Sequence, residues 1–311
     1  MGMRDRTPTT AEEFEAYRTR LNNWGRWGPD DQLGTLNHIS PEARQQAAAL
    51  VREGRSVSCA NPIATSAVVA DERRNRQPAD HRMNVGPASC GDYLGLYYHG
   101  FVNTHIDALC HIFTGPEGRL YNDRPSDLVT ETGALTNSVE HWRDGIVTRG
   151  VLYDIPRLRG QAHVQHGEPV EGWDLEDWAK QVGITPRAGD AVLVRSGAEP
   201  FWDANPGFEM TFPPLNTPGV GVSCLEFLHD TDASLLGWDL QEAGGQPDYG
   251  ERIPVHAIAI PHMGMPLLDN ANFERLAEVC AETGRYEFLM VVAPLVVNGG
   301  TGSPVNPVAT F

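Results

Sequence analysis

The sequence predicts an α/β fold with a mixed β-sheet core and flanking helices. Three observations predict it: two helix patterns in residues 1–55, short β-type runs in the middle of the chain, and helix patterns alternating with β-type runs towards its end. Neither internal repeats nor low-complexity tracts interrupt this order. We therefore expect residues 1–311 to form a single domain, with residues 1–55 as a helical extension packed on it.

Two helices are expected in the N-terminal extension. Thr10-Ala-Glu-Glu13 is a capping box, and the apolar residues that follow at helical spacing predict an amphipathic helix over about residues 10 to 22. Ser40-Pro41-Glu42 predicts the start of a second helix, because proline suits the first turn, and Gly54 is its expected stop.

Short β-type runs dominate the chain from Ser56 onward, at residues 56–63, 94–102, 145–155 and 190–197. A polar, charged segment between Ala64 and Asp92 is too long for a simple hairpin. Segments of this kind serve as lids, subunit contacts or mobile excursions, and the sequence leaves the three open.

The C-terminal half alternates helix and strand patterns. Asp174-Leu-Glu-Asp177 predicts a helix that runs to Gly183, and Ser223-Cys-Leu-Glu226 predicts another. The remaining patterns are the run A-S-L-L-G-W-D, the alternating run P-V-H-A-I-A-I, a helix around residues 273–284 and a strand from Tyr286.

Composition and charge narrow the classes of partner. With 24 Lys+Arg against 41 Asp+Glu, the formal charge is −17, which repels nucleic-acid backbones and anionic lipid surfaces. We find neither an apolar leader at the N-terminus nor a run of about 18 apolar residues, so we expect a cytoplasmic protein. The five cysteines are scattered and form no C-x-x-C pair, so we expect them to be reduced thiols that serve as packing residues.

Candidate chemistry is concentrated in the stretch H-G-F-V-N-T-H-I-D-A-L-C-H, residues 99–111. On a strand, His105 and Asp107 project from the same face and converge, a donor pair that suits zinc or manganese. His111 keeps the same parity, although A-L-C can already leave the strand. The alternative is a local hydrogen-bonded pair in a buried strand.

The stretch T-H-I-D-A-L-C-H resembles the signature H-x-G-T-H-x-D-x-P-x-H of the metal-dependent cyclase family, which includes bacterial kynurenine formamidases and isatin hydrolases. Segments near the C-terminus are similar to family segments in the same order, among them P-V-H-A-I-A-I-P-H-M-G-M-P-L-L-D-N and G-G-T-G-S-P-V-N-P-V-A. The resemblance implies a swivelling β/β/α fold and a homo-oligomer, a dimer or tetramer. It also implies that His105 and Asp107 are metal ligands and that His111 is a general acid or base.

The chain departs from the family pattern at several positions. Phe101 stands where the family has its first ligand histidine, and Asn103 stands at the motif glycine. The nearest matches to the ligands of a second metal are His256, about one place off, and Asp269, so a two-metal centre is not expected.

Other residues could restore coordination. Asn103 and His99 share the strand face of His105, and Glu242 lies at the end of a predicted strand. The alternatives are a turn asparagine, an exposed histidine and a solvated glutamate.

Three hypotheses about function follow. The first is a hydrolase of a small amide, cyclic imide or lactone, in which one divalent ion, Mn or Zn, is held by His105, Asp107 and a further ligand such as Asp269. In it His111 shuttles a proton, His256 is a second catalytic candidate, and abundant Trp and Tyr favour an aromatic small-molecule substrate. The second is a metal-independent cyclase, dehydratase or isomerase that uses histidine and carboxylate acid–base catalysis. The third is a non-catalytic binder or assembly subunit.

Overall fold

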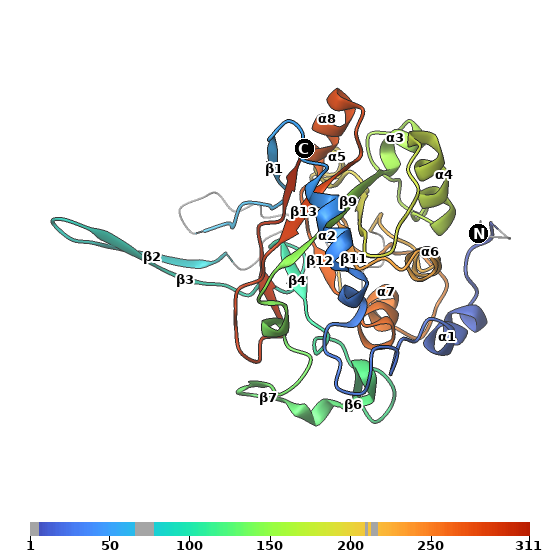
Figure 1. Ribbon diagram of the computed structural model, residues 1–311, viewed down its shortest axis with the longest axis horizontal. Helices are drawn as coiled ribbons and strands as arrows, with labels where there is room; N and C mark the ends of the chain where they lie inside the picture. Colours follow the sequence, from blue (N-terminus) through green and yellow to red (C-terminus); the bar gives the residue numbers. More distant parts are fainter. Residues whose placement is uncertain (1–5, 66–77, 209–210, 213–216) are drawn as a thin grey trace.

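A nine-stranded mixed sheet runs through the centre of the molecule (Figure 1). The computed structural model describes residues 6–65, 78–208, 211–212 and 217–311. The strands of this sheet are, in spatial order, β1 (Ser56–Ser58), β15 (Val308–Thr310), β13 (Glu287–Val292), β9 (Ile146–Asp154), β10 (Ala191–Arg195), β11 (Leu235–Trp238), β12 (Leu267–Asp269), β4 (His105–Asp107) and β14 (Gly302–Pro304). Strands β9, β10, β11 and β12 run parallel to one another. Strand β4 is antiparallel to both β12 and β14.

In the described part of the chain, three two-stranded sheets lie outside the central sheet. They are β2 (Asp80–Val85) with β3 (Cys90–Gly95), β5 (Arg119–Leu120) with β6 (Arg124–Pro125), and β7 (Val129–Thr130) with β8 (Gly133–Ala134). The β2–β3 hairpin projects well away from the rest of the molecule (Figure 1).

Helices cover the central sheet. The α-helices are α1 (Ala11–Arg20), α2 (Pro41–Ala48), α3 (Ile155–Arg159), α4 (Gly172–Val182), α5 (Ala198–Ala204), α6 (Cys224–Asp230), α7 (Pro254–Ile258) and α8 (Glu274–Thr283). A π-helical turn, Ala259–Met263, continues α7, and short 3-10 turns lie at Gly34–His38, Tyr121–Asp123, Ser126–Leu128 and Val139–Trp142. Helix α2 packs on β9 and β13, whereas α4 packs against α6 and β9.

The core forms on both faces of the central strands. All positions of β9 are buried except Val147, as expected for a strand covered on both faces. Trp178 of α4 is fully buried, and its indole Nε1 donates to the carbonyl of Leu152 at 2.8 Å. Phe14 and Tyr17 of α1 belong to the same apolar core, which fastens the N-terminal helix to the body.

The α/β fold with a mixed sheet and flanking helices is confirmed, and most element positions match. The capping box of Thr10 and Glu13 begins α1 as predicted. The second helix ends at Ala48 and not at Gly54, because the backbone N–H groups of Glu53 and Gly54 donate to the carbonyl of Phe311. The α4 helix starts before Asp174, since Glu171 caps it together with Asp174.

Two extended runs were predicted wrongly or ambiguously. Of residues 94–102, only Leu94 and Gly95 lie in a strand; the carbonyl of Gly100 instead accepts side-chain hydrogen bonds from Gln241 and Asn270. The alternating run of residues 254–260 is helical. All of these residues are buried, and a run that is buried on every side has no helical periodicity to distinguish it from a strand.

The polar segment between Ala64 and Asp92 includes β2 and the first residues of β3, so part of it forms a hairpin. Its residues 66–77 lie outside the described part, so its role as lid, subunit contact or excursion stays open. Within the described part of the chain, no helix combines the length and apolarity needed to cross a membrane.

Candidate metal centre

Strands β4 and β12 bring the first three candidate ligands together. His105 and Asp107 project from one face of β4, and Asp269 lies directly opposite His105 in the antiparallel pair. His105 Nε2 is 3.3 Å from Asp107 Oδ1 and 3.8 Å from Asp269 Oδ2. All three side chains are buried, so this end of the two strands forms a closed cluster of donor atoms.

Two further histidines approach Asp107 from irregular segments. His99, in the segment between β3 and β4, places Nδ1 2.9 Å from Asp107 Oδ1. His111, in the turn after β4, places Nε2 3.7 Å from Asp107 Oδ2. The two imidazole rings stack face to face, with centroids 3.8 Å apart, and each side chain keeps about a quarter of its surface exposed. This pair therefore forms the open side of the cluster.

His256 closes the other side. It lies in α7, and its Nε2 is 3.4 Å from Asp269 Oδ2 and 3.6 Å from Asp107 Oδ2. Glu242 Oε1 accepts hydrogen bonds from both the ring Nδ1 and the backbone N–H of His256. Glu242 is fully buried and His256 is 4% exposed, so this pair is almost completely shielded from solvent.

Hydrogen bonds from the surroundings fix how the inner side chains point. The Nδ1 of His105 is 2.8 Å from the carbonyl of Asn103, an arrangement in which Nδ1–H donates and the Nε2 lone pair faces the carboxylates. Trp238 Nε1 donates to Asp269 Oδ1 at 2.6 Å, and Gln241 Nε2 donates to Asp269 Oδ2 at 2.7 Å. Partners of this type orient the ligands of protein metal sites.

The electrostatics of the cluster favour a cation. Asp107, Asp269 and Glu242 are at most 2% exposed, and among the described residues their ion-pair partners are histidines. Both oxygens of Asp107, and Nδ1 of His99, are buried without a hydrogen-bond partner in the described structure. Buried carboxylate oxygens that accept no hydrogen bond are costly, so this set of atoms fits a positive ion.

Burial and neighbouring charges shift the pKa values of two of the histidines and of Asp107. Burial lowers the pKa of His111 to about 4, against the opposing effect of Asp107. Burial would also lower the pKa of His256, but the carboxylates of Glu242 and Asp269 outweigh it and hold that pKa well above its ordinary value. Burial would raise the pKa of Asp107, yet the surrounding histidines hold it well below its usual range.

Among the described residues, two sets of three side chains have ligand atoms close enough to share one ion: His99, Asp107 and His111, and His105, Asp107 and Asp269. Asp107 belongs to both sets.

A comparison with family models gives a match over residues 76–243 to the cyclase family, described as "Putative cyclase". The chain belongs to the cyclase family.

Several solved structures share the fold of the chain. A crystal structure described as a novel cyclase is 27% identical, with a TM-score of 0.80 over 98% of this chain and 100% of that one. An isatin hydrolase bound to the product analogue thioisatinate is 18% identical, with a TM-score of 0.55 over 88% of this chain and 97% of that one. Isatin hydrolase A from Ralstonia solanacearum is 18% identical, with a TM-score of 0.54 over 82% and 91%. Among curated proteins, the sequence has no significant match.

The other candidates of this cyclase-family chain lie around the cluster. Glu242 contacts His256 and not the remaining donor atoms. The side-chain amide of Asn103 donates to the carbonyl of Tyr97, so the hydrogen-bond partner of this amide lies outside the cluster. Phe101 is half-buried in the segment before β4 and contributes no donor atom. Sequence reasoning missed Trp238 and Gln241, although both lie in the run G-W-D-L-Q-E at the end of a predicted strand, where site residues gather.

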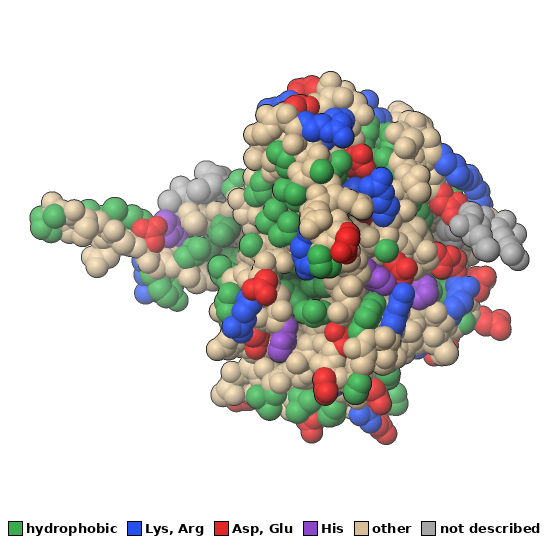
Figure 2. All heavy atoms as spheres, in the orientation of Figure 1, with side chains coloured by type: hydrophobic (Ala, Val, Ile, Leu, Met, Phe, Trp, Pro, Cys, Tyr) green, Lys and Arg blue, Asp and Glu red, His purple; other side chains and the backbone are tan. Residues whose placement is uncertain are grey.

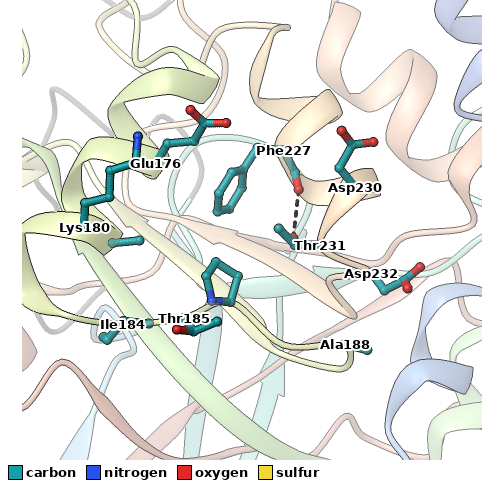
Figure 3. A pocket seen from close by; sticks show the side chains of 11 residues that line it. Glu176, Lys180, Ile184, Thr185, Ala188, Phe227, Asp230, Thr231 and Asp232 are labelled. Carbon is teal, nitrogen blue, oxygen red and sulfur yellow. Dashed lines mark hydrogen bonds between the residues drawn. The ribbon is translucent and has the colours of Figure 1, made fainter. Parts of the chain in front are cut away.

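A pocket of this cyclase-family chain lies away from the histidine cluster. A pocket of about 470 Å³ opens between the C-terminal ends of α4 and α6, beside the residues that precede β10 and β11 (Figure 3). Its lining includes Lys180, Thr185 and Phe227, and it contains none of the candidate ligands. Trp238 and Gln241 lie at the other, C-terminal end of β11, so the pocket and the histidine cluster are at opposite ends of the parallel strands.

Proposed function

We propose that this protein is a metal-dependent hydrolase of a small amide, cyclic imide or lactone, with one divalent ion, Mn or Zn, at the histidine–aspartate cluster. The observation that carries the proposal is the convergence of buried donor atoms on Asp107. His99 Nδ1 and Asp107 Oδ1 are 2.9 Å apart, yet neither atom makes a hydrogen bond. Two buried polar atoms in this relation fit a shared cation better than a direct contact.

We assign His105, Asp107 and Asp269, whose donor atoms lie close enough to share one ion, as the ligands, with His99, which approaches Asp107 from the other set, as a fourth donor. Nitrogen and carboxylate oxygen donors in this proportion suit zinc or manganese. In this assignment His99 replaces the histidine that the family pattern places at Phe101. The chain has five residues between His99 and His105 where the family pattern has three, and the irregular segment before β4 accommodates the longer connection.

A bound divalent ion would supply Lewis acidity, polarising a carbonyl and acidifying water. His111 is the proposed general acid or base, because it lies on the open side of the cluster, next to Asp107 and stacked on His99. It can accept a proton from the attacking water and return it to the leaving nitrogen or oxygen. His256, which is buried and held by Glu242, is placed as a positioning residue for Asp107 and Asp269.

Aromatic side chains near the open side support an aromatic substrate. The ring of Tyr98 lies 4.7 Å from the ring of His99 and 6.2 Å from that of His105, centroid to centroid. Tyr97, next to it, has 83% of its surface exposed. A flat substrate could stack against these rings while its carbonyl faces the cluster.

The test is metal analysis combined with activity on isatin, N-formyl aromatic amines and aromatic lactones. We expect about one equivalent of metal per chain, turnover of at least one substrate, and loss of both on chelation and on His105→Ala substitution. Less than about half an equivalent, with turnover insensitive to chelator, would instead favour the metal-independent acid–base enzyme. A ligand-binding protein whose His111→Ala variant behaves like the native chain would favour a non-catalytic role.

A further inference from the structure

His99 lies in a segment without regular structure, between β3 of the projecting hairpin and β4. Figure 2 shows the outer part of this hairpin clear of the body, so β3 does not lead the segment along a packed strand. His99 also stands two residues before Phe101, the position at which the family pattern has its first ligand histidine. The direction of the His99 ring must therefore be set by contacts that belong to this chain.

The side chain of Thr301, the residue just before β14, makes a polar contact with this ring. Thr301 Oγ1 lies 3.0 Å from His99 Nε2. The carbonyl of Thr301 accepts a hydrogen bond from the backbone N–H of Ala108 at 2.9 Å, which fixes Thr301 beside the end of β4. Thr301 thus connects His99 to the strand that carries Asp107.

Stacking and free space fix the plane of the His99 ring. The ring stacks on that of His111 with centroids 3.8 Å apart and meets the ring of His105 edge to face at 5.2 Å. Gly302 leaves room for it, because a Cβ at position 302 would lie 3.0 Å from His99 Cε1. These contacts hold the ring in place, but none of them decides which ring nitrogen carries the proton.

The hydroxyl of Thr301 also acts on Tyr98. Burial raises the pKa of Tyr98, and a hydrogen bond with the Thr301 side chain opposes that rise. A hydroxyl lowers the pKa of a phenol when it donates to the phenol oxygen, since this bond stabilises the charged form. Because Thr301 has a single hydroxyl hydrogen, it then offers His99 only the lone pairs of Oγ1. The donor in the contact between the two residues is therefore the Nε2–H of His99.

This arrangement of protons leaves the lone pair of His99 on Nδ1. A neutral imidazole carries one N–H and one lone pair, so an Nε2–H leaves Nδ1 without a hydrogen. Nδ1 lies 2.9 Å from Asp107 Oδ1, and within the described structure neither atom makes a hydrogen bond. In the reverse arrangement Nδ1–H would face Asp107, and the ring would have no lone pair on that side for a cation.

We propose that Thr301 is a positioning residue for His99, whose Nε2–H it accepts so that Nδ1 faces the cluster as the metal-binding nitrogen. This inference rests on the proposed metal site, in which His99 is the fourth donor. His105 has the opposite arrangement, because its Nδ1 faces the carbonyl of Asn103 at 2.8 Å and its Nε2 faces the carboxylates. Each histidine thus binds through the nitrogen that its own hydrogen bond leaves free.

The test compares two substitutions at Thr301. Thr301→Val removes the hydroxyl and keeps the branched shape, whereas Thr301→Ser keeps the hydroxyl. We expect Thr301→Val to weaken metal affinity about 10–100-fold, measured by competition with a chromogenic chelator, and Thr301→Ser to bind almost as tightly as the native chain. Thr231→Val is the matched control, because this half-buried threonine donates to the carbonyl of Phe227 at 2.8 Å, away from the cluster (Figure 3). Its metal affinity should equal that of the native chain.

Nitrogen-15 NMR of the metal-free chain gives a readout that needs no bound metal. Two-bond correlations show which nitrogen of each imidazole carries the proton, and the His99→Ala variant identifies the signals of His99. We expect the proton of His99 on Nε2 and that of His105 on Nδ1. A proton on Nδ1 of His99 in the native chain would overturn the proposal, as would equal metal affinity of Thr301→Val and the native chain, or an equal loss in both Thr301 variants. A native chain that binds no metal but carries the His99 proton on Nε2 would instead support the role of Thr301 and contradict only the proposed function.

Discussion

Asp269 faces His105 across the β12–β4 pair, and its Oδ2 lies 3.8 Å from His105 Nε2. This pairing joins two segments of the chain that are far apart in sequence. The indole of Trp238 and the amide of Gln241 then hold both oxygens of Asp269 towards the cluster.

His99→Ala is expected to weaken metal affinity by at least about 10–100-fold, the range seen when even an outer partner of a ligand is lost. The reason is the position of its Nδ1, 2.9 Å from Asp107 Oδ1 and without a hydrogen bond. Metal affinity is measured by competition with a chromogenic chelator. His141→Ala, at an exposed histidine, is the control. Unchanged affinity in His99→Ala would exclude His99 as a ligand.

Trp238→Phe is expected to lower metal affinity or turnover about 10–100-fold while the fold is retained. The substitution keeps an aromatic ring in the core but removes the N–H that donates to Asp269 Oδ1 at 2.6 Å. Titration with the metal and thermal unfolding measure the two effects separately. A loss of stability without any change in metal affinity would mean that Trp238 serves packing alone.

Gly302→Ala is expected to destabilise the protein by about 1–3 kcal/mol and to disturb His99. A Cβ at position 302 would lie 2.5 Å from the carbonyl oxygen of Ile106 and 3.0 Å from His99 Cε1. Gly207→Ala, where a Cβ meets nothing within 4 Å, should change stability by less than about 0.5 kcal/mol. Urea unfolding measures both values. Equal stability of the two variants would contradict the close packing at β14.

Stability is expected to fall between pH 7 and pH 5 because of His262. Burial lowers its pKa to about 4, and the imidazole contacts Thr114 Oγ1 and stacks on Trp24. Since the unfolded chain binds a proton near pH 6.5 and the folded chain does not, the stabilisation is complete above that pH and is lost as the pH falls towards 4. By pH 5, the protonation of His262 alone is expected to lower the free energy of unfolding by about 2 kcal/mol.

Urea unfolding of the native chain and of His262→Gln at the two pH values measures this contribution. The variant should lose less stability between pH 7 and pH 5 than the native chain does. His166→Gln, at an exposed histidine, should retain the native pH dependence. An identical pH dependence in His262→Gln would show that other groups are responsible.

The sequence was most informative where the chemistry is local. Alternation predicts that His105 and Asp107 share a strand face, and β4 confirms that geometry. The resemblance to the cyclase family and the α/β fold are confirmed as well. The roles of His105, Asp107, His111, His256 and Asp269, and the organisation of the chain as one domain, stay predictions.

Sequence reasoning was weaker where position depends on irregular backbone or on distant pairing. His99 reaches Asp107 through a segment without regular structure, so strand parity cannot predict its direction. Trp238 and Gln241 meet Asp269 only because β11 and β12 are neighbours in the sheet, and single-sequence patterns carry no information on strand order. His256 approaches from a buried helix, which alternation did not distinguish from a strand.

The position of β4 has a consequence for the order of folding. This three-residue strand lies between β12 and β14, and both of these partners come from the C-terminal part of the chain. Pairs between such distant segments close late, because a long loop must first be ordered. An ion present during refolding would therefore meet Asp269 only after the sheet is nearly complete. It should slow unfolding while leaving the refolding rate almost unchanged.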